Sequence, residues 1–157
     1  MSAHVFSHWS AKRFELDPRA YQQEADRFVY TKPRGLWFDA DSDWQRWCEA
    51  ESFATDSFKW RHILTLDFSR IILLTDKDEI DLFTERYAIA DRYGIAIDWP
   101  RVAQEFAGIV IAPYCWKRRM ADHARWYYGW DCASGCVWDL TAITSWSPTE
   151  VTEETTA

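Results

Sequence analysis

His8 and Ser10 are the first residues of this chain that could act on a ligand, because they follow a short apolar segment. The alternation of apolar and polar residues over 5–9 predicts a β-strand that ends beside them. An imidazole and a hydroxyl two residues apart could hold a ribose or an amide by paired hydrogen bonds. A single histidine more often satisfies a nearby backbone group, so His8 taken alone favours a structural role.

A second candidate is the aromatic stretch that begins with residues 32–38, KPRGLWF. A turn with Pro and Gly leads into a short strand over 35–38, and Ser42 is placed to cap a helix that extends to about residue 51. Trp44 and Trp47 share one side of that helix. Flat rings beside a glycine turn could stack on a nicotinamide or a nucleobase. A tryptophan-rich core is the alternative, and composition leaves the two interpretations equally open.

Asp131 is the third candidate, because it is the carboxylate within the aromatic stretch 127–135 before the last expected strand. In that setting it could orient a hydroxyl or stabilise a developing cation. An aspartate that forms a turn or a cap is an equally good interpretation or a slightly better one. Cys132 could be a nucleophile, but no convincing histidine partner accompanies it.

Motifs of other enzyme classes are absent from the sequence. It contains no G-x-S-x-G, H-E-x-x-H, P-loop or G-x-G-x-x-G pattern, which argues against classical hydrolases, metalloproteases, kinases and Rossmann enzymes. Cys115, His123, Cys132 and Cys136 could in principle bind zinc. Their spacing departs from that of common zinc modules, so we expect no metal. In a cytosolic protein the cysteines are expected to be reduced.

Length and charge restrict the remaining possibilities. A chain of 157 residues favours one domain. A net charge of −7 disfavours free binding to nucleic acid, although Lys117, Arg118 and Arg119 could contact a phosphate-bearing small molecule. No signal pattern and no long apolar segment is present, so we expect a soluble, cytoplasmic protein without a membrane partner.

The periodicity predicts an α+β fold with a mixed or mostly antiparallel sheet, described as one globular domain over 1–146 and a disordered acidic tail over 147–157. Residues 113–130 are expected to form a long, functional loop. The expected strands cover 5–9, 35–38, 59–66, 69–74, 108–112 and 134–143, and the expected helices cover 17–28, 42–51, 76–88 with Thr75 as its cap, and a short segment capped by Asp98.

The order of these motifs resembles the ADP-ribosyltransferase fold, in the branch shared by diphtheria-type toxins and poly(ADP-ribose) polymerases. In that branch the first strand ends in His-Gly-Thr/Ser, and His8-Trp9-Ser10 stands in that place. A Gly-x-Tyr-Phe strand follows about thirty residues later, matched by Gly35-Leu36-Trp37-Phe38. A Ser-capped helix with a second aromatic residue comes next, matched by Ser42 and Trp47. The resemblance covers most of residues 4–143 as pattern and order.

The resemblance implies NAD as the ligand, with nicotinamide stacked on Trp37 and the ribose held by His8 and Ser10. The family places a catalytic glutamate at a late strand, but the matching region 129–139 contains none. Asp131 or Asp139 would have to substitute with a shorter reach. The NAD-binding residues implied in this way are His8, Ser10, Gly35, Trp37, Ser42 and Trp47.

The expected function is therefore that of an NAD-dependent ADP-ribosyltransferase or NAD glycohydrolase, with protein, nucleic acid or water as the acceptor. One alternative is a catalytically inactive relative that binds a nucleotide. Another is a small acidic interaction or inhibitor protein that would use exposed rings, with Trp9, Trp44, Trp116 and Trp126 as candidates. Convergence of His8, Trp37 and Asp131 on one cleft would favour the nucleotide hypotheses.

Overall fold

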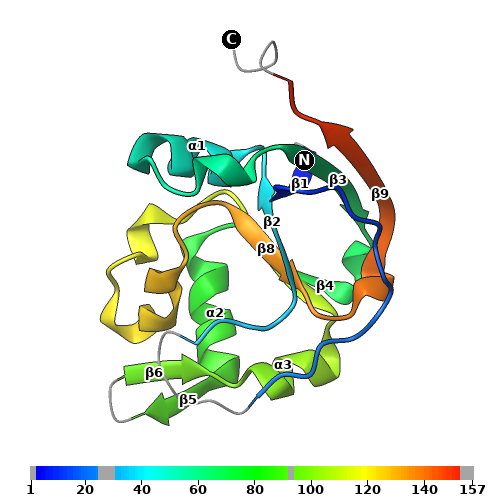
Figure 1. Ribbon diagram of the computed structural model, residues 1–157. Coiled ribbons are helices and arrows are strands. Elements are labelled where there is room, and N and C mark those ends of the chain that lie inside the picture. Colours follow the sequence, from blue (N-terminus) through cyan, green and yellow to red (C-terminus); the bar gives the residue numbers. More distant parts are fainter. Residues whose placement is uncertain (1–2, 25–30, 92–93, 153–157) are drawn as a thin grey trace.

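A curled sheet of seven strands forms the framework of the computed structural model, which describes residues 3–24, 31–91 and 94–152 (Figure 1). The strand order is β4-β7-β8-β2-β1-β3-β9. The β4–β7 pair is parallel, and the other neighbouring pairs are antiparallel, which confirms the predicted α+β class and mixed sheet. The strands are β1 Phe6–Ser10, β2 Leu36–Ala40, β3 Trp60–Leu66, β4 Ile71–Leu74, β7 Gly108–Ile111, β8 Ser134–Val137 and β9 Ile143–Glu150.

Three α-helices and a small hairpin complete the described part of the fold. In Figure 1, α1 lies beside one end of the sheet, and α2, α3 and the hairpin lie toward the opposite end. None of the helices in the described ranges has the length and apolar character needed to cross a membrane. The helices are α1 Asp43–Glu51, α2 Lys77–Tyr87 and α3 Trp99–Glu105, the hairpin is β5 Ala88–Asp91 with β6 Gly94–Ile97, and short 3₁₀ segments cover Thr55–Ser57, Phe68–Arg70, Trp116–Arg118, Asp122–Gly129 and Leu140–Ala142.

The two helices that cover the sheet begin at aspartate caps. Asp98 accepts a hydrogen bond from a backbone N–H of the first turn of α3, as the sequence predicts. For α2 the cap is Asp76, and the expected cap Thr75 lies one residue outside. Leu82 was expected in the buried stripe of α2, but 67% of it is exposed. The other residues of the expected stripe, Ile80, Phe83 and Tyr87, are buried as predicted, and Leu82 falls outside the face that they form.

Strand β2 separates two hydrophobic clusters, one on each side of the sheet. Phe38 packs with Phe6 and Leu64 in the cluster enclosed by the curl. The second cluster lies under α2 and α3. Because successive side chains of a strand point to opposite faces, Trp37 and Asp39 turn away from Phe38, toward the side of the second cluster.

Three local expectations were wrong or incomplete. The single strand expected over 134–143 is two strands, β8 and β9, separated by a 3₁₀ turn. The tail expected to be disordered from residue 147 pairs with β3 as far as Glu150, because backbone hydrogen bonds and the stacking of Trp146 on His62 at 4.8 Å outweigh its polar composition. Residues 17–24 form no helix and make one isolated bridge, Ala20 to Asp139; the rest of the helix expected over 17–28 lies outside the described residues.

Candidate functional site

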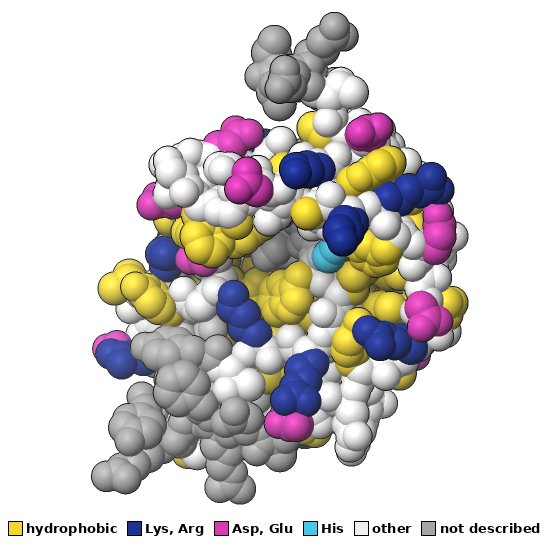
Figure 2. Space-filling view, viewed as in Figure 1, with side chains coloured by type: hydrophobic (Ala, Val, Ile, Leu, Met, Phe, Trp, Pro, Cys, Tyr) yellow, Lys and Arg dark blue, Asp and Glu magenta, His cyan; other side chains and the backbone are white. Residues whose placement is uncertain are grey.

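A cavity of about 340 Å³ opens where β1 and β2 meet α1 and the segment that leads into β8. Figure 2 shows it as a hollow near the middle of this face, with hydrophobic side chains inside, a histidine at its edge and Lys and Arg side chains around it. His8, Trp37 and Asp131 all line this cavity. The three residues whose convergence would favour the nucleotide hypotheses therefore lie at one cavity.

Tryptophans form the walls of the cavity. Trp37 meets Trp130 edge to face, with ring centroids 5.0 Å apart. Trp44 also lines the cavity, and Trp47 stacks against it at 5.1 Å with an interplanar angle of 7°. Trp47, another predicted NAD-binding residue, thus packs against a wall residue and is not itself part of the lining.

A row of buried polar residues crosses three strands on the cavity side. Ser7 of β1 is paired with Asp39 of β2, and Asp39 is paired with Ser134 of β8. Paired residues of antiparallel strands point to the same face of a sheet. All three are buried and line the cavity, and we call them the polar row. The cavity therefore combines aromatic walls with a polar floor.

Asp39 is the site residue that the sequence analysis missed. Its Oδ2 atom accepts hydrogen bonds from the Trp9 indole at 2.9 Å and from the backbone N–H groups of Trp44 at 3.1 Å and Gln45 at 3.4 Å. Its Oδ1 atom is buried without a partner among the described residues. Burial raises the pKa of Asp39 to about 6, even though these hydrogen bonds and the charge of Arg61 act in the opposite direction.

Two expectations about the segment from β2 to α1 were wrong: the capping side chain of α1 and the end of β2. Ser42 occupies the residue before the helix, but its side chain makes no capping hydrogen bond. The carboxylate of Asp39, a residue of β2, accepts the hydrogen bonds from the first backbone N–H groups of α1 instead. The expected strand ended at Phe38, whereas β2 continues to Ala40. An aspartate between Phe38 and Ala40, inside an apolar strand, was the signal that could have identified Asp39.

His8 is held as a neutral ring with a defined tautomer. Its Nδ1 atom lies 2.6 Å from the carbonyl oxygen of Trp37, and because a carbonyl only accepts, Nδ1 carries the hydrogen. The backbone pairing of β1 with β2 ends at Ser7 and Asp39. Beyond this pair, the side chain of His8 forms the hydrogen bond to the carbonyl of Trp37. Burial lowers the pKa of His8. The neutral ring therefore keeps a lone pair on Nε2, which could accept a proton.

His62, the neighbour of His8 on β3, has a structural role. Its Nδ1 atom donates to the carbonyl of His8 at 3.1 Å, and its Nε2 atom accepts from the backbone N–H of Phe14 at 3.3 Å. Both ring nitrogens are used, and burial lowers the pKa of His62. Of this pair, His8 is the histidine that lines the cavity.

Asp131 lies at the cavity but is already paired. Arg119 approaches its Oδ1 atom at 3.3 Å and also donates to the hydroxyl of Tyr114 and to the carbonyl of Trp130. Asp131 can therefore contribute to the site only together with a neighbouring positive charge. Asp139, the other residue considered in place of a late-strand glutamate, forms an ion pair with Arg70 at 2.7 Å and does not line the cavity.

Ser10 and Gly35, two of the predicted NAD-binding residues, do not line the cavity either. The hydroxyl of Ser10 donates to the carbonyl of Lys12 at 2.6 Å. Gly35 is required for packing, because a Cβ atom at this position would lie 2.3 Å from the carbonyl oxygen of Val137. The contact of Ser10 is therefore local in the chain, whereas Gly35 lies close against β8.

Two cations lie over the tryptophans at the cavity. The Lys32 ammonium is 5.3 Å from the ring centre of Trp37, and the Arg61 guanidinium is 5.3 Å from that of Trp9. Arg61 also donates to the hydroxyl of Ser7 at 2.8 Å. Neither cation forms an ion pair with a carboxylate of the described residues. Lys32 in the lining and Arg61 beside Trp9 thus place two unpaired cations near the cavity, which also contains the carboxyl groups of Asp39 and Asp131.

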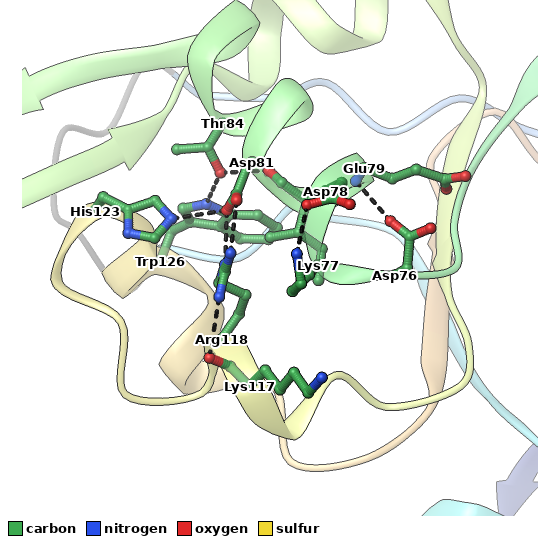
Figure 3. A network of polar contacts seen from close by, with 11 residues as sticks. Asp76, Lys77, Asp78, Glu79, Asp81, Thr84, Lys117, Arg118, His123 and Trp126 are labelled. Carbon is green, nitrogen blue, oxygen red and sulfur yellow. Dashed lines mark hydrogen bonds and ion pairs between the residues drawn. The ribbon is translucent and has the colours of Figure 1, made fainter.

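The aromatic and basic segment 113–130 is anchored to α2 and is not a free loop (Figure 3). Asp81 accepts hydrogen bonds from Arg118 at 2.8 and 2.7 Å and lies 2.7 Å from Nε2 of His123. The Arg118 guanidinium, with a further contribution from His123, holds the pKa of Asp81 far below its usual range. The indole of Trp126 donates to the hydroxyl of Thr84 at 2.8 Å. The basic cluster therefore fixes the fold of the segment through Arg118 and, at Asp131, through Arg119.

The cysteines offer little chemistry. All four are free thiols, and burial raises the pKa of Cys132 to about 12, which leaves it a weak nucleophile. Within the described ranges, no three His, Cys, Asp or Glu side chains are grouped so as to hold a metal ion.

The rings considered for an interaction surface are mostly not available on the outside. Trp126 is buried, and Trp9 and Trp44 line the cavity and are half-buried. Trp116 is 70% exposed. Comparison with known proteins adds no further constraint, because no protein-family model, curated protein or solved structure matches the chain.

Proposed function

We propose that the cavity binds a nucleotide, with a flat ring among the tryptophans and the phosphates near Lys32 and Arg61. The observation that carries this proposal is the convergence of His8, Trp37 and Asp131 on one cavity. NAD is the first ligand to test, because nicotinamide can stack on Trp37 and its diphosphate carries the charge that the two cations favour.

The composition of the cavity supports a ligand that is both aromatic and polar. Small-molecule sites are usually apolar pockets with a few well-placed polar groups. Here the walls are Trp37, Trp44 and Trp130, and the polar groups are His8 and the polar row. A purely apolar ligand would place no polar group against His8 and the polar row.

The reaction that this arrangement favours is cleavage of the N-glycosidic bond of NAD. The bond between C1′ and the nicotinamide nitrogen breaks with its electron pair on nicotinamide, and an acceptor oxygen forms the new bond to C1′. Nε2 of His8 is the group that would take the proton of the acceptor hydroxyl. A carboxylate of the cavity would stabilise the cationic transition state, with Asp131 as the residue nearest to the family pattern.

Binding without turnover is a second candidate function. No glutamate lines the cavity among the described residues, and the charge of Asp131 is compensated by Arg119. A relative that has lost catalysis would keep the aromatic walls and the cations while losing the free carboxylate. The protein would then act as a receptor for NAD, ADP-ribose or a related nucleotide.

Calorimetry and product analysis separate these functions. The purified protein is titrated with NAD and with ADP-ribose, and nicotinamide release is followed with water and with a cell lysate as the acceptor. Trp37→Ala should weaken binding at least tenfold. Trp116→Ala is the matched control, because that ring is exposed and does not line the cavity. Binding with release supports the enzyme, binding alone supports the receptor, and no binding to either nucleotide rejects the proposal.

A further inference from the structure

The segment that follows β1 is held against the sheet through the backbone of Phe14. The N–H of Phe14 donates to Nε2 of His62 on β3 at 3.3 Å, and its carbonyl accepts from the indole of Trp146 on β9 at 3.1 Å. Both partners are side-chain ring nitrogens, and residues 11–16 belong to no strand. The attachment of the segment at Phe14 therefore depends on the state of these two rings.

The ring of Phe14 packs against the histidine of the cavity. Its centroid lies 5.4 Å from that of His8, edge to face, and 4.6 Å from that of His62. Phe14 is 36% exposed, so it gains less from burial than a core residue and relies more on the two backbone bonds. The other fixed contact of the His8 side chain is its bond to the carbonyl of Trp37.

His62 can hold Phe14 in only one protonation state. Its Nδ1 atom donates to the carbonyl of His8 at 3.1 Å, so in the neutral ring Nε2 carries no hydrogen and accepts from Phe14. Protonation adds a hydrogen to Nε2. The N–H of Phe14 and the new N–H of His62 would then face each other without an acceptor, whereas the bond to the carbonyl of His8 would be kept.

We propose that His62 is a positioning residue for His8 that acts through Phe14, and that it acts only as the neutral ring. Neutral His62 holds the ring of Phe14 against His8, and protonated His62 releases it. This inference rests on the proposed nucleotide function, because a His8 ring that has lost the contact with Phe14 is less well ordered for a ligand in the cavity.

The groups around His62 determine the pH range of this change. Burial is the largest effect and lowers the pKa of His62. The carboxylate of Glu15 favours the charged ring, whereas Arg13, which is paired with Glu15 at 2.9 Å, and the neighbouring His8 disfavour it. Trp146 of β9 stacks on the ring and does not titrate. We therefore expect Phe14 to be held at neutral pH and released below pH 6.5.

The first measurement is made by NMR on the ligand-free wild type. The ring nitrogen shifts of His62 report its tautomer and its titration, and hydrogen exchange of the Phe14 amide reports the bond to Nε2. The protection factor of this amide should fall at least about tenfold as His62 becomes protonated, because the donor loses its acceptor. Protection that stays constant while His62 titrates would overturn the proposal, and so would a neutral ring with its hydrogen on Nε2.

His62→Gln separates the proton from the other properties of the side chain. Glutamine offers N–H donors and a carbonyl acceptor and does not titrate. In this variant the protection of the Phe14 amide should no longer fall with pH, although His8 and Asp39 still titrate. A fall equal to that of the wild type would assign the effect to another group and overturn the role of His62. Where glutamine does not reproduce the bond, the wild-type titration alone decides.

Phe14→Leu tests the connection to the cavity. Loss of the ring should shift the ring resonances of His8 and weaken binding of NAD and ADP-ribose by about three- to tenfold, because a freer side chain must be ordered on binding. Phe68→Leu is the matched control, since Phe68 is also partly exposed and rests on a ring of β1, 5.9 Å from Phe6, outside the cavity lining. Equal effects of the two variants on His8 and on affinity would overturn the proposal.

The outcomes separate this inference from the function on which it rests. Failure of the wild type to bind NAD and ADP-ribose would reject the nucleotide function, while the exchange of the Phe14 amide and the resonances of His8, which need no ligand, would still decide the role of His62. Nucleotide binding together with constant protection of Phe14 would reject this inference alone.

Discussion

The indole N–H of Trp9 donates a 2.9 Å hydrogen bond to Oδ2 of Asp39 and so links β1 to β2 inside the cavity. This bond is the largest of the effects that oppose the rise in the pKa of Asp39 caused by burial. It therefore connects the charge of the buried carboxyl to an aromatic residue of the cavity lining.

Trp9→Phe should raise the pKa of Asp39 above about 6, because the ring is kept while the donor to the carboxylate is removed. The measurement is a pH titration of the Asp39 carboxyl carbon by NMR. Trp116→Phe, at an exposed ring away from the cavity, should leave the titration unchanged. A pKa that stays constant or falls in Trp9→Phe would contradict the assigned role of the bond.

Asp39→Asn should change how stability depends on pH. The pKa of Asp39 is raised from 3.8 to about 6 in the folded state, so its contribution to stability is present below pH 3.8 and is lost as the pH rises through about 6. The loss is about 3 kcal/mol for a shift of this size. Asparagine has no proton to lose, so the variant should lack this decrease while keeping an oxygen acceptor for Trp9.

The measurement for this variant is urea denaturation between pH 4 and 7, read as the difference between wild type and variant. The difference is needed because the two histidines with lowered pKa values, His8 and His62, affect stability in the opposite sense. Their contribution to the stability of the protein is present above pH 6.5 and is lost as the pH falls. The charge of Arg61 also lowers the pKa of Asp39, and Arg61 is unchanged in the variant. Parallel curves for the two proteins would disprove the prediction.

Gly35→Ala should destabilise the fold by about 2 kcal/mol or more, because the added Cβ would meet the backbone of Val137 and cannot be accommodated by a side-chain rotation. Ser10→Ala should cost about 0.5 kcal/mol, as for a typical surface substitution. Thermal and urea unfolding measure both changes. Neither variant should alter nucleotide affinity while folded, and a large loss of affinity in folded Gly35→Ala would restore the binding role inferred from the motif.

Asp81→Asn should loosen the segment 113–130 at a cost of about 1 kcal/mol after allowance for solvent screening. The bidentate contact with Arg118 and the contact with His123 are both weakened by the loss of charge. Asp122→Asn is the matched control, since its pair with Arg125 is exposed and local. Urea denaturation and amide hydrogen exchange of the segment measure the effect. Equal exchange rates in the two variants would argue against Asp81 as the anchor.

Local sequence signals were sufficient wherever the determinants lie close together in the chain. The Asp98 cap with Pro100 marks the start of α3, and the run of β-branched and leucine residues marks β4. The spacing of Trp44 and Trp47 predicts a shared helix face, and the two rings stack. In each case the interacting residues are neighbours along the chain, so the pattern alone contains the information.

The sequence by itself determined the α+β class, the aromatic character of the cavity, and the choice of His8, Trp37 and Asp131 as residues to examine together. Only the tertiary structure decided which of these groups are free to act. It paired Asp131 with Arg119 and aligned Ser7, Asp39 and Ser134 across three strands. Strand register and burial arise from contacts between segments far apart in the chain, and no local pattern encodes them. For that reason the buried carboxyl of Asp39 became apparent only in the folded protein.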